Sequence, residues 1–248
     1  MKHFIILGSA NAVPKIDQEN THLYAQVETR RILVDCGDNA LVSLKKNKIN
    51  PNTITDLILT HFHPDHAGSL PLLIMTMWLE KRTQPLTIHG LDYTLDRAKA
   101  LLGLFGWSNW AGMYPVAFNT VNEEGPTTLI QDENINVTGM AVKHLIPTIG
   151  LRLEFVDGKT VAYSCDTEPC DNLMKLANGA DFLLQESAGP GKGHTSAEQA
   201  GEIAATAKVD QLVLIHYDQS VGSEKLLSAA KKNFKGEVRL AVDGTALF

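Results

Sequence analysis

Three histidines and one aspartate lie within six residues of this sequence. They are His61, His63, Asp65 and His66, and they directly follow the apolar residues 57–59. Imidazole and carboxylate groups are the ligands that zinc and similar divalent cations prefer in proteins. Because the whole chain holds only nine histidines, a polar turn of chance composition explains this density poorly. The segment therefore predicts a metal site.

The spacing His61-x-His63-x-Asp65-His66 resembles the signature motif of the metallo-β-lactamase superfamily of binuclear hydrolases. The resemblance implies an α/β fold, the four-layer αββα sandwich, with the metal ions at one edge of two packed sheets. It also implies further ligands outside this motif.

Three more candidate ligands each follow an apolar run that is typical of a strand: His144, Asp166 and His216. Side chains at the carboxyl ends of strands gather at one edge of a sheet. Each of the three, taken alone, could also be a buried and hydrogen-bonded histidine or a turn aspartate. Together, and in the order that the family has them, they favour a metal centre.

The resemblance implies two divalent metal ions, zinc or alternatively manganese or iron, with separate ligand sets. One set is His61, His63 and His144, the other is Asp65, His66 and His216, and Asp166 bridges both ions. Hydroxide generated from water between the ions would be the nucleophile, and Asp65 would also accept a proton from the attacking water. The histidines that match no ligand position are His3, His22 and His89, which we expect at the surface (His3) or in packing and rim positions.

A further aspartate, Asp35, ends the apolar run 32–34. The resemblance implies that it supports metal ligands without being a ligand itself. It could equally be the N-cap of a helix predicted over 40–46. The sequence leaves these alternatives open.

The segment 183–200 narrows the family, because it holds Glu186 and His194 in an order that resembles the ribonuclease Z branch (tRNA 3′-processing endonucleases) and its phosphodiesterase relatives. There the glutamate and the histidine form a pair near the metals. A histidine held by a carboxylate keeps its proton near neutral pH and can give it to a leaving alkoxide. The alternative is a surface loop with incidental polar residues. Thr195 and Glu198 predict a capping box that opens the next helix.

Departures from that branch concern the substrate. Gln185 stands where the branch usually has histidine, and the two residues after Glu186 also differ. Only 22 positions (166 − 144) separate His144 from Asp166. Most ribonuclease Z proteins have a long tRNA-gripping arm there, whereas this sequence predicts a hairpin over 151–163.

The strands and helices that must position these residues are predicted from apolar periodicity and turn residues. The predicted strands are 4–7, 23–27, 32–34, 57–59, 87–90, 135–142, 151–155, 161–163, 182–184, 212–215 and 238–242, and the predicted helices are 40–46, 67–79, 92–102, 171–177, 196–207 and 223–232. Asp92 is expected to cap the helix that it begins. Strands in both halves with helices between them indicate two sheets with outer helical layers. The aromatic stretch 105–115 could pack into the core or form a lid over the metals.

The length fits one large domain or two small ones, and the composition is that of a soluble protein. The sequence shows no linker between domains, and the resemblance implies a single metallo-β-lactamase-like hydrolase domain over 1–248. Hydrophobic residues make up 44% of the chain and charged residues 20%, which is ordinary for a globular protein. The N-terminal apolar run is too short for a signal peptide or a membrane span. Three irregularly spaced cysteines indicate no disulfide framework, so we expect a cytoplasmic protein.

We therefore interpret the chain as a binuclear metal-dependent hydrolase, a phosphodiesterase related to ribonuclease Z that acts on a small-molecule or nucleotide phosphodiester. The net charge of −6 and the missing arm disfavour tRNA as a partner, no membrane partner is expected, and a homodimer is compatible with the sequence. The alternatives are a lactonase or other ester hydrolase, a tRNA 3′-processing endonuclease that manages without the arm, and a metal-bound sensor without turnover. Glu186 and His194 argue against the sensor, because a pure binder needs no proton donor.

Overall fold

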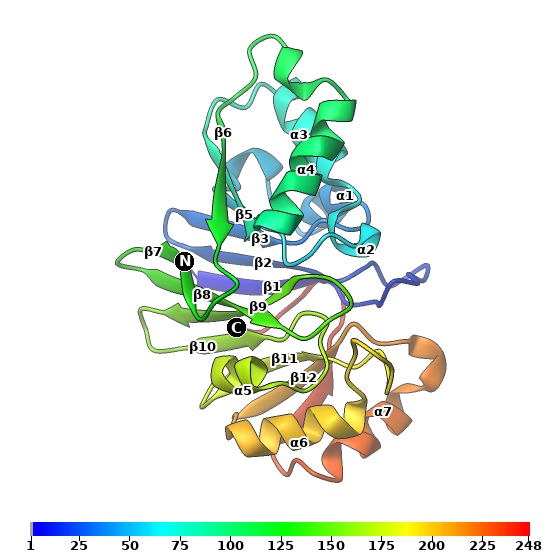
Figure 1. The fold of residues 1–248 in the computed structure, drawn as a ribbon. Coiled ribbons are helices and arrows are strands. Elements are labelled where there is room, and N and C mark those ends of the chain that lie inside the picture. Colours follow the sequence, from blue (N-terminus) through cyan, green and yellow to red (C-terminus); the bar gives the residue numbers. More distant parts are fainter. Residues whose placement is uncertain (1) are drawn as a thin grey trace. The chain divides into compact units, whose positions relative to one another are not determined.

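The structure is a computed structural model that describes residues 2–248, and these fall into two compact units. The first unit consists of residues 2–8, 15–120 and 242–248, and the second of Ser9–Pro14 and Val121–Ala241. Each unit is built on one seven-stranded sheet (Figure 1). The chain thus contains two mixed sheets with helices, as the sequence predicts.

The first unit has a sheet of strand order β14-β1-β2-β3-β4-β5-β6. Its elements are β1 (Lys2–Gly8), β2 (His22–Val27), β3 (Arg30–Val34), α1 (Ala40–Lys46), η1 (Pro51–Thr53), β4 (Asp56–Ile58), α2 (Pro64–Ala67), α3 (Leu70–Leu79), β5 (Leu86–Leu91), α4 (Asp92–Leu104), η2 (Trp107–Asn109), β6 (Val116–Val121) and β14 (Thr245–Ala246). Strands β1, β2 and β3 are antiparallel, whereas β3, β4 and β5 are parallel. The parallel part places the ends of β3 and β4 at the same edge of the sheet.

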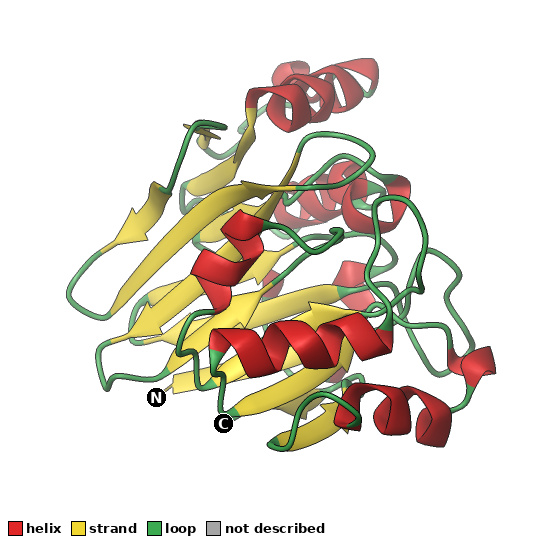
Figure 2. Cartoon of the chain, turned by 60° about the horizontal axis from the view of Figure 1, so that its bottom comes forward, coloured by secondary structure: helices red, strands yellow, loops and turns green. Residues whose placement is uncertain are grey.

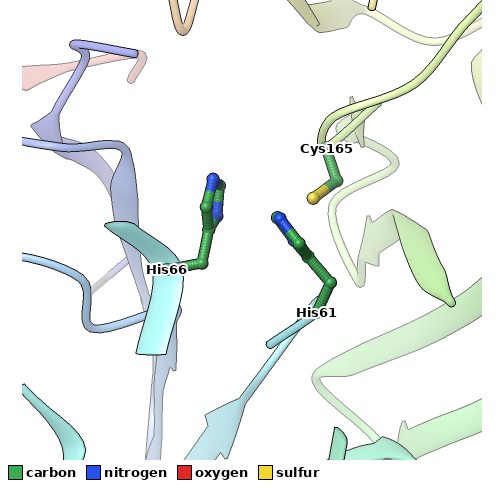
Figure 3. Close-up of side chains that lie close together, drawn as sticks. All are labelled: His61, His66 and Cys165. Atoms are coloured by element: carbon green, nitrogen blue, oxygen red, sulfur yellow. The ribbon is translucent and has the colours of Figure 1, made fainter. Parts of the chain in front are cut away.

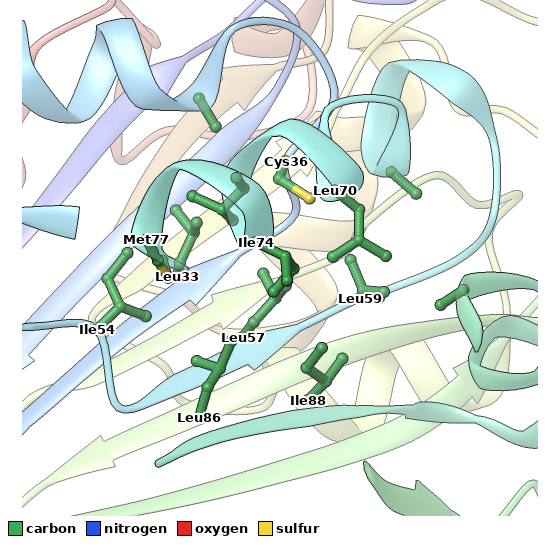
Figure 4. Packing of buried hydrophobic residues seen from close by; sticks show 14 of the residues in the cluster. Leu33, Cys36, Ile54, Leu57, Leu59, Leu70, Ile74, Met77, Leu86 and Ile88 are labelled. Carbon is green, nitrogen blue, oxygen red and sulfur yellow. The ribbon is translucent and has the colours of Figure 1, made fainter. Parts of the chain in front are cut away.

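An apolar core holds α3 against this sheet. The helix buries Leu70, Ile74 and Met77 completely, and they pack with residues of β4 and β5 such as Leu57 and Ile88 (Figure 4). Burying a side chain of this size stabilises a fold by roughly 1.5–3 kcal/mol. The helix that follows the histidine-rich segment is therefore firmly anchored.

The predicted helix over 67–79 begins at Leu70, because Gly68 and Ser69 separate it from α2. The Ser69 N–H and hydroxyl both donate to the carbonyl oxygen of Cys36, which ties the break to the turn after β3. A Cβ on Gly68 would lie 2.5 Å from the carbonyl oxygen of Pro64, so the break requires glycine. The break gives the ligand-bearing residues a short helix of their own.

The second unit has a sheet of strand order β13-β12-β11-β10-β9-β8-β7. Its elements are β7 (Thr127–Gln131), β8 (Ile135–Val142), β9 (Thr148–Phe155), β10 (Thr160–Tyr163), α5 (Asp171–Ala177), β11 (Phe182–Glu186), α6 (Ala197–Ala207), β12 (Gln211–Ile215), η3 (Gln219–Val221), α7 (Ser223–Lys231) and β13 (Glu237–Leu240). Strands β7 to β10 are antiparallel and β10 to β13 are parallel. Helices α5, α6 and α7 pack on this sheet (Figure 2). Parallel β10, β11 and β12 therefore end at one edge, where three candidate site segments begin.

Most predicted elements are confirmed, with ends that shift by at most three residues, but β6, β7 and β14 were not predicted. The hairpin between His144 and Asp166 is confirmed: the Phe155 N–H donates to the Lys159 carbonyl oxygen, and Gly158 adopts a φ of +88° in the turn. In the described part of the chain, none of the three cysteines forms a disulfide bond. Within residues 2–248, no helix combines the length and the apolar character that a membrane span requires.

Two helix starts were predicted wrongly. The capping box of α6 is formed by Ser196 and Gln199, whereas the Thr195 hydroxyl is buried and donates to the Thr167 carbonyl oxygen. Helix α4 has Leu91 as its N-cap, and Asp92 is its first helical residue, with a carboxylate that accepts from Thr120 Oγ1. In both cases a polar side chain that could cap a helix is engaged elsewhere.

Candidate metal centre

The four candidate ligands of the first unit lie on the turn after β4 and on α2. His63 is the N-cap of α2, and Asp65 and His66 lie within the helix. His61 and His66 are fully buried, and their rings lie side by side with centroids 4.1 Å apart (Figure 3). The Cys165 that is also labelled there belongs to the second unit. The turn thus gathers its imidazoles as the motif predicts.

A buried carboxylate, Asp35, fixes the ring of His66. Its Oδ2 accepts a hydrogen bond from His66 Nδ1 at 2.9 Å, and its oxygens also accept from the Thr60 N–H and hydroxyl at 2.8 Å each. With Nδ1 protonated, His66 directs the lone pair of Nε2 toward Asp65 Oδ2, 3.4 Å away. Asp35 therefore supports a candidate ligand, and the N-cap alternative is wrong because Asn39 caps α1.

The same carboxylate orients His61 through Thr60. Because the Thr60 hydroxyl donates to Asp35, its oxygen accepts from His61 Nδ1 at 3.1 Å. The Nε2 of His61 is left with a lone pair and lies 3.1 Å from Nδ1 of His63. Two nitrogens on one tetrahedral zinc are about 3.4 Å apart at the usual Zn–N distance. This pair therefore has the spacing of two ligands of one cation.

The candidate ligands of the second unit converge on one carboxylate oxygen. Asp166 Oδ2 lies 3.4 Å from His216 Nε2 and 4.0 Å from His144 Nε2. The Nδ1 of His144 donates to the Gly193 carbonyl oxygen at 2.7 Å, so its Nε2 carries the lone pair. The Asp166 carboxylate is buried between two imidazoles. This is the arrangement expected of a ligand that serves two cations.

Glu186 is fully buried and holds the neighbouring loop by four hydrogen bonds. Its Oε1 accepts from His194 Nδ1 at 3.1 Å and from the amides of Thr167 and Thr195, and its Oε2 accepts from the amide of Ala188. Burial raises the pKa of the Glu186 carboxyl, and the hydrogen bond from His194 opposes this shift. The predicted pair of Glu186 and His194 is present, and it is no incidental surface contact.

His194 lies beside the candidate ligands of its unit. Its ring centroid is 5.0 Å from that of His144 and 5.8 Å from that of His216, with which it stacks at 15°. The ligand atoms of His144, Asp166 and His194 all lie within 4.8 Å of one another. A quarter of its side chain is exposed, so a substrate can reach it.

Three residues of these groups have left-handed backbone conformations although none is glycine. Asp35, Cys165 and His216 have φ values of 63°, 53° and 53°, and each lies where a strand gives way to site residues. Such conformations cost of order 1–3 kcal/mol and persist where the surroundings fix them. The surrounding structure therefore fixes an unusual backbone conformation at three strand ends next to candidate site residues.

Two further histidines, His22 and His89, are engaged elsewhere, as expected for packing positions. His89 is buried and bonds through Nε2 to Asp56 and through Nδ1 to Asn119, both at 3.0 Å. His22 is buried with Nδ1 donating to the Asn20 carbonyl oxygen, and burial lowers its pKa.

Comparison with known proteins identifies the chain. The sequence model of the family described as "Anti-Pycsar protein Apyc1" matches residues 2–239. The chain belongs to this family. Its fold, its donor groups and this membership make the Apyc1-family chain a metal-dependent hydrolase of the metallo-β-lactamase superfamily, related to ribonuclease Z.

Relatives of this Apyc1-family chain are similar to it in sequence or in structure over nearly its full length. The "Ribonuclease Z" of Methanothermobacter thermautotrophicus is 24% identical in an alignment 291 positions long, which covers 94% of this chain and 92% of that protein. The metallo-β-lactamase fold protein YhfI from Bacillus subtilis has a TM-score of 0.84 at 22% identity, covering 99% and 98% of the two chains. The short form of human tRNase Z (ELAC1) has a TM-score of 0.81 at 23% identity, covering 99% and 98%. The metallo-β-lactamase fold that the motif predicts is confirmed.

Several site residues of the Apyc1-family chain were not foreseen from the sequence. Thr60 donates to Asp35 and accepts from His61, Gly193 accepts from His144, and Glu168 accepts from the Gly193 amide. None of these stands in a spacing that indicates metal chemistry. They are revealed only by their hydrogen bonds to a candidate ligand or, for Glu168, to the residue that holds one.

Proposed function

We propose that this chain is a binuclear phosphodiesterase that hydrolyses small nucleotide phosphodiesters, with cyclic nucleotides as its substrate class. The observation that carries the proposal is the pair of Glu186 and His194 beside the candidate ligands. An alkoxide is a poor leaving group, and a positioned imidazolium can protonate it as the P–O bond breaks. The family supports the substrate class, since Apyc1 is a cyclic nucleotide phosphodiesterase.

The ligands of both units would together hold two divalent cations, zinc or alternatively manganese or iron. The assignment that we propose is His61, His63 and His144 for one ion, Asp65, His66 and His216 for the other, and Asp166 for both. All are imidazoles or carboxylates, which is the donor set that these metals accept. When bound, the cations supply an acidified water and positive charge for the phosphoryl oxygens.

The chain's own residues would move the protons. Asp65 accepts a proton from the water that attacks phosphorus, and His194 donates one to the ribose oxygen that leaves. Glu186 holds Nδ1 of His194, so that Nε2 is the atom that gives up its proton. With a cyclic nucleotide, a bond forms between phosphorus and the oxygen of the attacking water. The P–O bond of the ring breaks, and the product is a nucleoside monophosphate. His194 is then neutral and Asp65 protonated, and the starting state returns when Asp65 releases its proton to solvent and His194 takes one up.

Transfer RNA is a poorer substrate for this surface. The segment between His144 and Asp166 is occupied by the β9–β10 hairpin, and the net charge is −6. Three of the lysines on or next to helices already pair with carboxylates: Lys45 with Glu80, Lys46 with Glu19 and Lys232 with Glu198. Nucleic-acid affinity depends on cations that are available to replace counterions.

We therefore expect kcat/KM for 3′,5′-cyclic nucleotides to exceed that for precursor tRNA by roughly 100-fold or more, since few phosphate contacts are available. Initial rates with purified, zinc-reconstituted protein measure this, with lactones as a third substrate class. Efficient cleavage of precursor tRNA with a steep salt dependence would contradict the proposal. Turnover of lactones without any phosphodiester hydrolysis would favour the ester hydrolase instead.

A further inference from the structure

A second carboxylate of the second unit, Glu168, lies where three site-bearing segments meet. It is two residues beyond Asp166, on the turn after β10. Its backbone N–H donates to the Lys143 carbonyl oxygen at 2.8 Å, in an isolated bridge to the residue before His144. Its side chain reaches the loop that carries His194, where Oε1 accepts the Gly193 N–H at 2.9 Å.

The backbone of Gly193 is hydrogen-bonded through both its N–H and its carbonyl group. Its N–H is bound by the carboxylate of Glu168, and its carbonyl oxygen accepts from Nδ1 of His144 at 2.7 Å. Gly193 has a φ of +82°, and a Cβ there would lie 3.0 Å from His144 Nδ1. Gly193 therefore lies directly against the imidazole, and a shift of this residue moves the ring's hydrogen-bond partner.

We propose that Glu168 is a positioning residue: by fixing the backbone of Gly193, its carboxylate sets the orientation and tautomer of His144 and the place of the loop that carries His194. With Nδ1–H held by the Gly193 oxygen, Nε2 of His144 keeps its lone pair for a metal. Lys143 contacts the other carboxylate oxygen, but that lysine is mostly exposed and adds little. The inference rests on the proposed metal site, but not on the identity of the substrate.

Two substitutions distinguish the effect of the length of the Glu168 side chain from the effect of its charge. Glu168→Asp keeps the charge but is one methylene too short for the Gly193 N–H, so zinc affinity should fall about tenfold, at the lower end of the usual loss for groups that orient ligands. Glu168→Gln loses the charge but keeps an oxygen at the same reach, so it should retain affinity within about twofold of the wild type. Zinc affinity is measured by competition with a chromophoric chelator.

The control is Glu154→Ala, which removes an ion-paired glutamate of β9 that bonds to Arg152 and Asn136 outside the ligand group. It should leave zinc affinity unchanged. In metal-free full-length protein, ¹⁵N spectra of labelled histidine should show the Nδ1–H form of His144 in the wild type and in Glu168→Gln, and a tautomer mixture in Glu168→Asp.

Wild-type affinity and an unchanged His144 tautomer in Glu168→Asp would overturn the proposal, as would equal losses in Glu168→Asp and Glu168→Gln. Neither readout requires turnover. Failure of the wild type to hydrolyse any phosphodiester would therefore refute the proposed function without deciding the role of Glu168.

Discussion

Replacing His194 by alanine should lower the turnover of substrates with alkoxide leaving groups by roughly 10²–10⁴-fold, which is the usual contribution of a positioned general acid. Metal content should not change, because the substitution removes no proposed ligand. The loss should shrink for p-nitrophenyl phosphodiesters, since p-nitrophenolate leaves without a proton. Glu186→Gln should lose less than His194→Ala, because it loosens the imidazole that Glu186 holds at 3.1 Å without deleting it.

The measurement is kcat for a cyclic nucleotide and for bis(p-nitrophenyl) phosphate, with the metal content of each variant determined in parallel. His3→Ala is the matched control, because it removes a histidine of β1 that matches no ligand position. Equal losses on both substrates in His194→Ala would refute the acid role and leave His194 as a residue that positions substrate.

Asp166→Ala should abolish activity on every substrate and release metal together with it. Its Oδ2 lies within 3.4–4.0 Å of the Nε2 atoms of His216 and His144, so its removal deprives both proposed ions of a shared anion. Groups that only orient ligands contribute about 10–100-fold to metal affinity, and a direct bridging ligand should therefore cost more than about 100-fold. The leaving group should make no difference, in contrast to His194→Ala.

Metal analysis, zinc competition and kcat on both substrate types test this expectation. Asp210→Ala removes an exposed carboxylate of the same unit and serves as the control. Circular dichroism of the metal-free proteins tests whether Asp166→Ala is folded. Asp166→Asn provides a less disruptive replacement. If the Asp166→Ala protein keeps two metals and measurable activity, Asp166 is not a ligand of the centre.

Much of the candidate site could be predicted from the sequence because its signals are local. The histidine motif places its groups within six residues, and each remaining candidate ligand follows an apolar strand. Parallel pairing then brings the ends of β10, β11 and β12 to one edge without further information. The Asp35 alternatives could not be separated, because a turn aspartate and a helix N-cap share the same local pattern.

The supporting contacts could not be predicted, because they join residues far apart in sequence through ordinary side chains and peptides. Glu168 and Gly193 are 25 positions apart, and the carbonyl that fixes His144 lies 49 positions away. The wrong capping box has the same cause: Thr195 has the right local spacing, but its buried hydroxyl bonds to the Thr167 carbonyl and Ser196 takes the cap. Strands β6 and β7 escaped detection because most of their residues are exposed or half exposed.

The proposed centre holds two catalytic cations per chain, and a zinc titration of chelator-stripped protein tests this number most directly. Bound zinc and the rate of cyclic nucleotide hydrolysis are followed together as metal is added back. We predict two zinc ions per chain, negligible hydrolysis without metal, and full hydrolysis only as the second equivalent binds. Hydrolysis that persists in the stripped protein, or a bound-metal content that stays near zero after reloading, would contradict the account.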